Sequence, residues 1–219
     1  MVASIPSNPE RRPLQATLRA RVWLLRTIVG VVAVLLAGGL WYLSLQLGSR
    51  SEPIVSGAPS VGGPFTLINA EGKQVTDRDF LGEYMLIYFG YTFCPDVCPT
   101  TLSKMASALE KLDAKGDRVQ MLFITIDPRR DTPAVIGQYI TALSPHLICL
   151  TGTGEQIAAV EKGYRVYAAE HRTGNNPNDY TMDHSGIVYL MGPDGRFVAL
   201  IRADDDADSI AADISRNVR

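Results

Sequence analysis

Residues 90–99 read GYTFCPDVCP and contain two of the three cysteines in this 219-residue chain. They follow the apolar run at residues 84–89, which is typical of a strand covered on both faces. They precede residues 99–115, where leucine, methionine and alanine recur at helical spacing and predict a helix with one buried face. Two thiols four positions apart at a strand-to-helix turn therefore predict a metal or redox site.

The two cysteines differ in their place relative to the predicted helix. Cys98 falls in its first turn, where free backbone N–H groups and the helix dipole stabilise a thiolate, so we expect a lowered pKa for this thiol. Cys94 comes four residues earlier, and both sulfurs can face one point. Two soft thiolates select soft metals, above all Cu(I), with zinc as the competitor. A structural disulfide between the two cysteines is the alternative interpretation.

Two sulfurs alone make a poor metal cage, and the chain has three histidines that could add a ligand. Ligands in sheets with parallel strands bind where the carboxyl ends of those strands meet, which is the edge that holds the cysteine turn. His184 precedes a predicted strand at 187–191, which starts at that edge if it runs antiparallel to residues 84–89. His184 is therefore the candidate third ligand, and a histidine satisfied by polar groups in a tight loop is the alternative. His146 and His171 have no such argument.

Charge divides the chain into two parts. The first 50 residues contain six arginines and one acidic residue, Glu10, whereas the remainder has 22 acidic and 15 basic residues. This acidic remainder has no electrostatic footprint for nucleic acid, and we exclude nucleic-acid binding.

Residues 28–45 (IVGVVAVLLAGGLWYLSL) carry no charge and are long enough to cross a bilayer at about 1.5 Å per residue. Trp23, Trp41 and Tyr42 lie near the ends of this segment, where amphipathic aromatic side chains favour the headgroup region. Because the arginines lie on its N-terminal side, we expect the tail in the cytoplasm and the acidic part exported. A cleaved signal peptide is the alternative, but no convincing cleavage site follows. In an oxidising compartment the two cysteines can cycle between dithiol and disulfide.

These features predict four regions. Residues 1–26 form a basic cytoplasmic tail, residues 27–47 a single transmembrane anchor, and residues 48–63, rich in glycine, serine and proline, a flexible linker. Residues 64–219 form the folded domain.

Within the domain, strand and helix patterns alternate, which argues for an α/β mixed sheet with helices on both faces. The element order matches, by analogy, the strand–helix–strand and hairpin–helix core of a thioredoxin-like fold. A polar loop is expected at 170–179. The predicted strands are 65–68, 73–76, 84–89, 119–126, 146–150, 164–168, 187–191 and 197–201, and the predicted helices are 99–115, 131–143, 153–162 and one after the acidic residues 204–208.

Taken together, the motifs resemble the Sco/SenC family of thioredoxin-like, membrane-tethered copper proteins, which help mature the binuclear copper centre of cytochrome c oxidase. The resemblance implies that Cys94, Cys98 and His184 are copper ligands, for Cu(I) with Cu(II) as the other oxidation state considered. Many members have histidine where this chain has Phe93, which removes one further ligand. The matching stretches are residues 90–99, 125–133, 150–152, 164–167 and 183–185, within a region from about residue 64 to 201.

The resemblance also implies partners and a location. The expected partners are the copper-bearing subunit of cytochrome c oxidase, other copper donors or thiol reductants, and the membrane itself. We expect a bacterial inner-membrane protein with a periplasmic C-terminal domain; the alternative is the mitochondrial inner membrane, facing the intermembrane space. A metallochaperone is favoured over an enzyme. The alternative function is a membrane-anchored thiol–disulfide oxidoreductase that reduces an exported partner through Cys94 and Cys98, and redox or copper signalling is a third interpretation.

Other residues near these motifs have simpler roles. Cys149 lies between two apolar residues and is expected in the core. Asp127 ends a strand and Asp131 caps a helix, although both lie near the cysteine edge, where a supporting or docking role is open to them. Tyr88, Tyr91 and Phe93 are expected in the core or at the rim of the site.

Overall fold

The computed structural model describes residues 26, 30–36, 38–39, 42, 61–143 and 146–219, without the side chains of 141 and 142. The chain divides into two compact units, Met1–Ala58 and Pro59–Arg219. In the first unit the described residues are helical. Among all described residues, no helix combines the length and the apolar character needed to cross a membrane. Most of the predicted tail (1–26) and linker (48–63), and much of the predicted anchor (27–47), lie outside the described residues.

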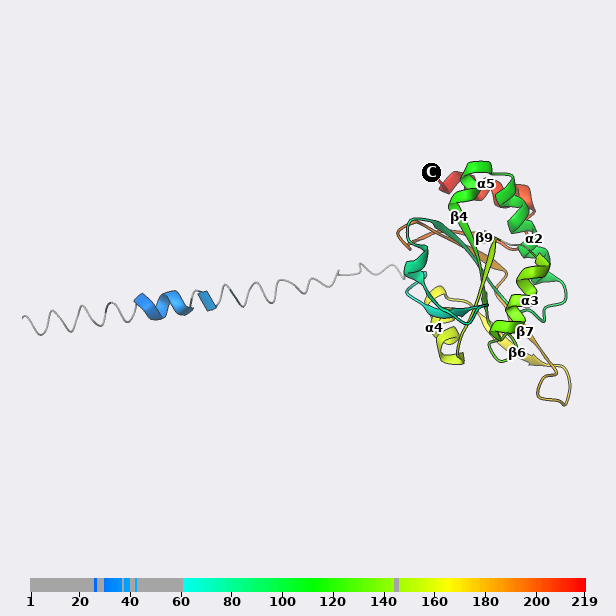
Figure 1. Ribbon diagram of the computed structural model, residues 1–219, viewed down its shortest axis with the longest axis horizontal. Helices are drawn as coiled ribbons and strands as arrows, with labels where there is room; N and C mark the ends of the chain where they lie inside the picture. Colours follow the sequence, from blue (N-terminus) through cyan, green and yellow to red (C-terminus); the bar gives the residue numbers. More distant parts are fainter. Residues whose placement is uncertain (1–25, 27–29, 37, 40–41, 43–60, 144–145) are drawn as a thin grey trace, which may run out of the picture. The chain divides into compact units, whose positions relative to one another are not determined.

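Seven strands of the second unit form one mixed sheet in the order β2-β1-β5-β4-β3-β8-β9 (Figure 1). The three central strands, β3, β4 and β5, are parallel, and an antiparallel hairpin flanks them on either side. This is the predicted thioredoxin-like arrangement. The strands are β1 (Thr66–Asn69), β2 (Gln74–Thr76), β3 (Tyr84–Gly90), β4 (Val119–Thr125), β5 (Leu147–Thr151), β8 (Ile187–Met191) and β9 (Phe197–Arg202).

The helices join these strands along the chain. α2 packs against α5 and also contacts α3, while α4 contacts β1. Short 3₁₀ helices precede β3 and β4. The helices are α2 (Val97–Glu110), α3 (Pro133–Leu143), α4 (Gly154–Tyr164) and α5 (Ala207–Asn217), and the 3₁₀ helices are η1 (Asp77–Phe80) and η2 (Asp113–Arg118).

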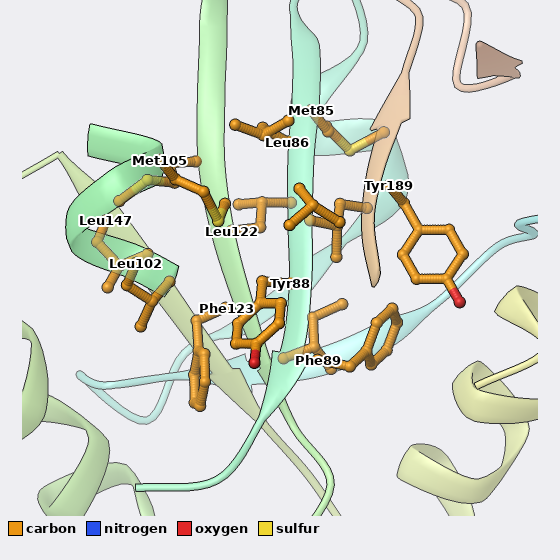
Figure 2. Close-up of a cluster of buried hydrophobic side chains, with 14 of the residues drawn as sticks. Met85, Leu86, Tyr88, Phe89, Leu102, Met105, Leu122, Phe123, Leu147 and Tyr189 are labelled. Carbon is orange, nitrogen blue, oxygen red and sulfur yellow. The ribbon is translucent and has the colours of Figure 1, made fainter. Parts of the chain in front are cut away.

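Both faces of the sheet are covered, as the aromatic side chains of β3 demonstrate. Neighbouring residues of a strand point to opposite faces. Tyr88 packs with Phe123 of β4, which in turn contacts Tyr139 of α3. Phe89, the next residue, packs instead against Tyr164 of α4. Figure 2 shows Tyr88 and Phe123 together on the α2 side and Phe89 beside Tyr189 on the other. The prediction of helices on both faces is confirmed.

A second, two-stranded sheet differs from the sequence-based prediction. β6 (Ala168–Arg172) and β7 (Tyr180–His184) form an antiparallel hairpin that projects from the main sheet at the lower right of Figure 1. The predicted loop at 170–179 is therefore wrong in part, because the polar character of these residues reflects a hairpin that is mostly exposed. The predicted strand at 164–168 is also wrong. Its first residue, Tyr164, is the last residue of α4, and Arg165 caps that helix in a left-handed conformation with φ of 58°. Only the last residue of the predicted range, Ala168, lies in a strand, as the first residue of β6.

The remaining elements lie close to their predicted ranges. The helix predicted at 99–115 is shorter: α2 begins two residues earlier and ends at Glu110, and η2 follows it. The early start matters for the site, because it puts Cys98 at the second residue of the helix.

Candidate metal and redox site

The cysteine turn connects the carboxyl end of β3 to α2. The Cys94 N–H donates to the carbonyl of Tyr91 at 3.2 Å, which forms a turn just before the helix. Cys98 is fully buried, whereas Cys94 is half-buried. The turn packs tightly against the strand, since a Cβ atom on Gly90 would lie 2.8 Å from Cys98 Sγ. Glycine at this position is therefore what lets the sulfur of Cys98 approach β3.

A free N–H group at the start of α2 binds Cys94 rather than Cys98. The Cys98 N–H donates to Cys94 Sγ at 3.4 Å. The Cys98 thiol itself is enclosed by the core, and this burial raises its pKa to about 12. The predicted lowering of the Cys98 pKa is therefore wrong, because desolvation outweighs the helix terminus at this sulfur. Both cysteines, and Cys149, are free thiols in this structure.

His184 faces the buried thiol. Its Nε2 atom lies 3.7 Å from Cys98 Sγ, and its Nδ1 atom lies 3.2 Å from the carbonyl oxygen of Ser185. Because a carbonyl can only accept, Nδ1 is the nitrogen that carries the proton, and Nε2 directs its lone pair toward the sulfur. Burial lowers the pKa of His184, which favours the neutral imidazole that can act as a ligand. The ring also makes edge contacts with Tyr88 and Tyr91.

The topology that brings His184 to this edge is the one predicted. β8 runs antiparallel to β3, with Val188 opposite Tyr88, so the residues before β8 lie beside the end of β3. Two hydrogen bonds fix the segment next to His184: the Ser185 N–H donates to the Tyr167 carbonyl, and the Tyr167 N–H donates to Ser185 Oγ.

The other two histidines lie elsewhere. His146 immediately precedes β5 and therefore lies at the amino end of the parallel strands, opposite the cysteine edge. His171 is exposed on β6. Neither is brought to the cysteine turn.

The donor atoms at this edge suit a soft metal. Two cysteine sulfurs and an imidazole nitrogen are the ligand types that Cu(I) prefers. Within residues 61–143 and 146–219, no three His, Cys, Asp or Glu side chains are already grouped as a metal site. The assignment of Cys94, Cys98 and His184 as metal ligands stays a prediction.

A shallow groove of about 540 Å³ opens over the site. Two of its large apolar side chains, Val97 and Tyr167, are 54% and 63% exposed. Such a groove leaves Cys94 and His184 within reach of another molecule. Its lining includes Tyr91, Cys94, Val97, Tyr167, Met182 and His184.

Comparison with known proteins agrees with this geometry. Residues 55–219 match the family model described as SCO1/SenC. The chain belongs to the SCO1/SenC family. It is 42% identical to human "Protein SCO1 homolog, mitochondrial" over 165 residues, which cover 74% of this chain and 54% of that protein. It is 35% identical to the SCO2-like protein RP587 of Rickettsia prowazekii over 189 residues, covering 84% of this chain and 92% of the relative.

The solved structure of Bradyrhizobium japonicum ScoI with copper bound is 44% identical to this SCO1/SenC chain, with a TM-score of 0.66. The similarity covers 72% of this chain and 99% of the ScoI chain. The chain spans about half the length of the first mitochondrial relatives that it matches.

Asp131 holds the cysteine turn of this SCO1/SenC protein through hydrogen bonds to Thr92. Its carboxylate is fully buried and accepts hydrogen bonds from the Thr92 N–H, the Thr92 hydroxyl and the Thr125 hydroxyl. These partners lie on the turn and on β4, and α3 begins only at Pro133. The prediction that Asp131 caps a helix is therefore wrong, because Thr132 directly precedes α3 and the Asp131 side chain instead joins the strand end to the residue two positions before Cys94. Burial raises the pKa of this carboxyl group.

Asp127 belongs to a second polar group that sequence analysis missed. It accepts hydrogen bonds from the Tyr180 hydroxyl at 2.8 Å and from Arg130. Arg130 and Tyr180 carried no function in the sequence-based predictions. An arginine between two acidic residues at a strand end was the available signal, but nothing in the local sequence indicates that Tyr180, 50 residues later, lies beside it.

The predictions for four single side chains are confirmed. Cys149 is fully buried in β5, opposite Phe123 of β4. Tyr88 and Tyr91 are buried, and the Tyr88 hydroxyl lies 3.9 Å from Cys98 Sγ. Phe93 is 56% exposed at the rim.

Proposed function

We propose that this protein is a copper chaperone that holds copper with Cys94, Cys98 and His184 and delivers it to the binuclear copper centre of cytochrome c oxidase. The observation that carries the proposal is the approach of His184 Nε2 to 3.7 Å from Cys98 Sγ, across 86 residues of sequence. Burial keeps this histidine neutral, so its Nε2 atom and the Cys98 sulfur together supply two ligands that suit a soft metal.

Family relationships support copper as the cargo. ScoI, which shares 44% of its residues with this chain, has been solved with copper bound. Membership of the SCO1/SenC family favours the copper-bearing subunit of the oxidase as the recipient, with separate copper donors and thiol reductants as further partners.

Each of the three proposed ligands would have a different part in copper binding. Cys94 is half-buried, so its sulfur can meet incoming copper first, and the Cys98 N–H holds that sulfur in place. Cys98 has a raised pKa, so copper must displace the proton of this thiol, and binding releases a proton. His184 supplies its Nε2 lone pair. Because the groove leaves one side of the copper site open, sulfur ligands of the recipient could replace Cys94, Cys98 and His184 one at a time.

Residues 27–47 would anchor this copper site to a membrane. The arginine-rich tail would remain on the cytoplasmic or matrix side, and the domain would face the periplasm or the intermembrane space. The named relatives include mitochondrial proteins and a Rickettsia protein, so both locations remain within the proposal. Protease accessibility of the domain in intact spheroplasts, before and after detergent lysis, tests this topology.

Copper competition tests the proposed ligands. The full-length, anaerobically reduced chain in detergent is titrated with a coloured Cu(I) chelator. We expect about one copper per chain. Cys94→Ala, Cys98→Ala and His184→Ala should each weaken binding by at least about 100-fold, because even the loss of an outer partner of a ligand typically costs about 10–100-fold.

Matched controls separate ligand loss from general damage. Cys149→Ala removes a buried thiol on β5, which β4 separates from β3, and His171→Ala removes an exposed imidazole. Both variants should bind copper like the wild type. Equal binding by all five variants would overturn the proposed site.

A thiol–disulfide oxidoreductase is the second candidate, favoured by the half-buried Cys94 that accepts a helix N–H bond. In that reaction Cys94 attacks a partner disulfide, Cys98 resolves the mixed disulfide, and the partner leaves with two thiols while the protein gains one disulfide. His184 has no part in this exchange. An assay of partner reduction in which His184→Ala keeps full activity, while Cys98→Ala loses it, would favour this function over copper delivery.

A further inference from the structure

Arg130 is an arginine enclosed within the site edge. Only 10% of its side chain is exposed, and its Nε atom pairs with Asp127, of which 3% is exposed. Its Nη1 atom donates to the carbonyl oxygen of Tyr180 at 2.9 Å. A planar guanidinium can make both bonds at once because its donors point in fixed directions. The segment after β4 is thereby tied to the first residue of β7.

The same guanidinium also packs against aromatic rings from two different segments. Its Cζ atom lies 3.6 Å from the ring centre of Tyr180 and 4.8 Å from that of Phe93, with Tyr91 at 5.7 Å. Cation–π contacts of this kind strengthen when the cation is removed from water. Tyr91 and Phe93 lead directly into Cys94, so one side chain touches both the cysteine turn and the start of β7.

Tyr180 is held at three points. Arg130 binds its carbonyl oxygen and covers its ring, and Asp127 accepts its hydroxyl proton at 2.8 Å. Tyr180 is the first residue of β7, and His184 is the last. The position of one end of this five-residue strand therefore sets the position of the other.

β7 needs such an attachment. In the described part of the chain its only strand partner is β6, and β6 is mostly exposed. An isolated two-stranded hairpin is marginally stable in water. Contacts outside the hairpin must therefore hold it against the main sheet, and the Arg130 contacts supply them at the end of β7 remote from His184.

We propose that Arg130 is a positioning residue that fixes β7, and with it His184, against the Cys94–Cys98 turn. The proposal rests on the function proposed above, in which His184 is a copper ligand. Arg130 would not touch copper itself. Its loss would let β7 move, so that His184 Nε2 spends less time facing Cys98 Sγ.

The test uses the full-length chain in detergent and two matched pairs of variants. Arg130→Lys and Arg130→Met are compared with Arg129→Lys and Arg129→Met. Arg129 is the right control because it also lies over the Tyr180 ring, at 4.6 Å, and pairs with Glu170, yet 59% of its side chain is exposed. Lysine keeps the charge at position 130 but cannot reproduce two directed bonds.

Three measurements report on the position of His184. In metal-free protein, amide hydrogen exchange across Tyr180–His184 should accelerate at least about tenfold in Arg130→Lys, because local opening becomes easier. The His184 imidazole resonances should move toward those of an exposed histidine. Copper competition should show affinity lower by about 10–100-fold, the usual effect of losing a partner that orients a ligand. The Arg129 variants should stay within about twofold of wild type, as expected for an exposed side chain.

The outcomes separate the two proposals. If Arg130→Lys lowers the melting temperature but leaves the exchange rates, the imidazole resonances and the copper affinity unchanged, Arg130 is only structural and the inference is wrong. If wild type binds no copper, the proposed function fails, while the exchange and imidazole measurements still decide whether Arg130 positions His184. Should Arg130→Met fail to fold, Tyr180→Phe provides the second variant. It keeps the ring contact but loses the bond to Asp127, and it should accelerate exchange less than Arg130→Lys does.

Discussion

Cys98 Sγ and His184 Nε2 lie 3.7 Å apart, at the end of the sheet where β3 stops and β8 begins. The Ser185 carbonyl binds the opposite side of the imidazole, so the ring cannot turn away without losing that bond. This pair is the centre of the site, and Cys98 differs in its surroundings from the other thiol of the turn, Cys94.

The two cysteines of the turn should differ in reactivity. Burial raises the pKa of Cys98 to about 12, whereas Cys94 is half-buried beside the groove. Iodoacetamide near neutral pH should therefore modify Cys94 first and leave Cys98 largely as the thiol, since only the thiolate reacts. Peptide mass spectrometry after timed quenching measures both rates. In denaturant the two rates should converge, and equal rates in the folded protein would contradict the prediction.

His184 should titrate below its ordinary pKa of 6.5 in metal-free protein, because burial disfavours the charged ring. As pH falls below about 6.5, the unfolded chain takes up a proton that the native state does not, so the free energy of unfolding decreases toward the lowered native pKa. NMR of the imidazole gives the midpoint, and urea unfolding at several pH values gives the slope. His184→Gln should lack this part of the slope. A wild-type midpoint at or above 6.5 would refute the prediction.

Substitutions of Asp131 should separate charge from hydrogen bonding. Its pKa is raised by burial, so the native state keeps a proton that the unfolded chain loses, and stability falls as pH rises from 3.8 toward the raised value. The asparagine of Asp131→Asn can still form hydrogen bonds with Thr92 and Thr125. Because it does not titrate, this variant should lack the decrease in the free energy of unfolding with rising pH. Asp131→Ala should cost roughly 1–3 kcal/mol for each donor left unsatisfied.

Urea unfolding between about pH 3 and pH 7 compares the Asp131 variants. The difference between wild type and Asp131→Asn isolates this carboxyl group from all others. Identical pH profiles for these two proteins would mean that the carboxyl group does not titrate as its burial implies.

Gly90→Ala should damage the site through a single methyl group. Its Cβ atom would lie 2.8 Å from Cys98 Sγ and 2.9 Å from the Phe123 ring. Overpacking of this kind typically costs about 1–3 kcal/mol, and here the sulfur must also shift. Thermal unfolding and copper competition measure the two effects. Gly154→Ala is the control, because nothing lies within 4 Å of its new methyl group. Comparable behaviour of the two variants would disprove the close-approach argument.

Elements with a strong local pattern were predictable. The apolar runs at β3 and β4 and the turn sequences of the flanking hairpins placed those strands correctly, since buried strands and tight turns leave direct signatures in composition. The hairpin of β6 and β7 was missed because its residues are mostly exposed, and an exposed hairpin lacks the apolar run by which a strand is recognised. The error at Tyr164 has a related cause: its apolar character reflects packing on Phe89 from a helix end.

By itself, the sequence determined the thiol pair at a strand-to-helix turn, the order of the central elements and the return of His184 to the same edge, because these follow from spacing and from the rules of strand connection. Only the tertiary structure decided which sulfur receives the helix N–H bond, how deeply Cys98 is buried, and that Arg130 joins Tyr180 to the cysteine turn. Those properties depend on desolvation and on contacts between side chains distant in sequence, for which no local pattern exists.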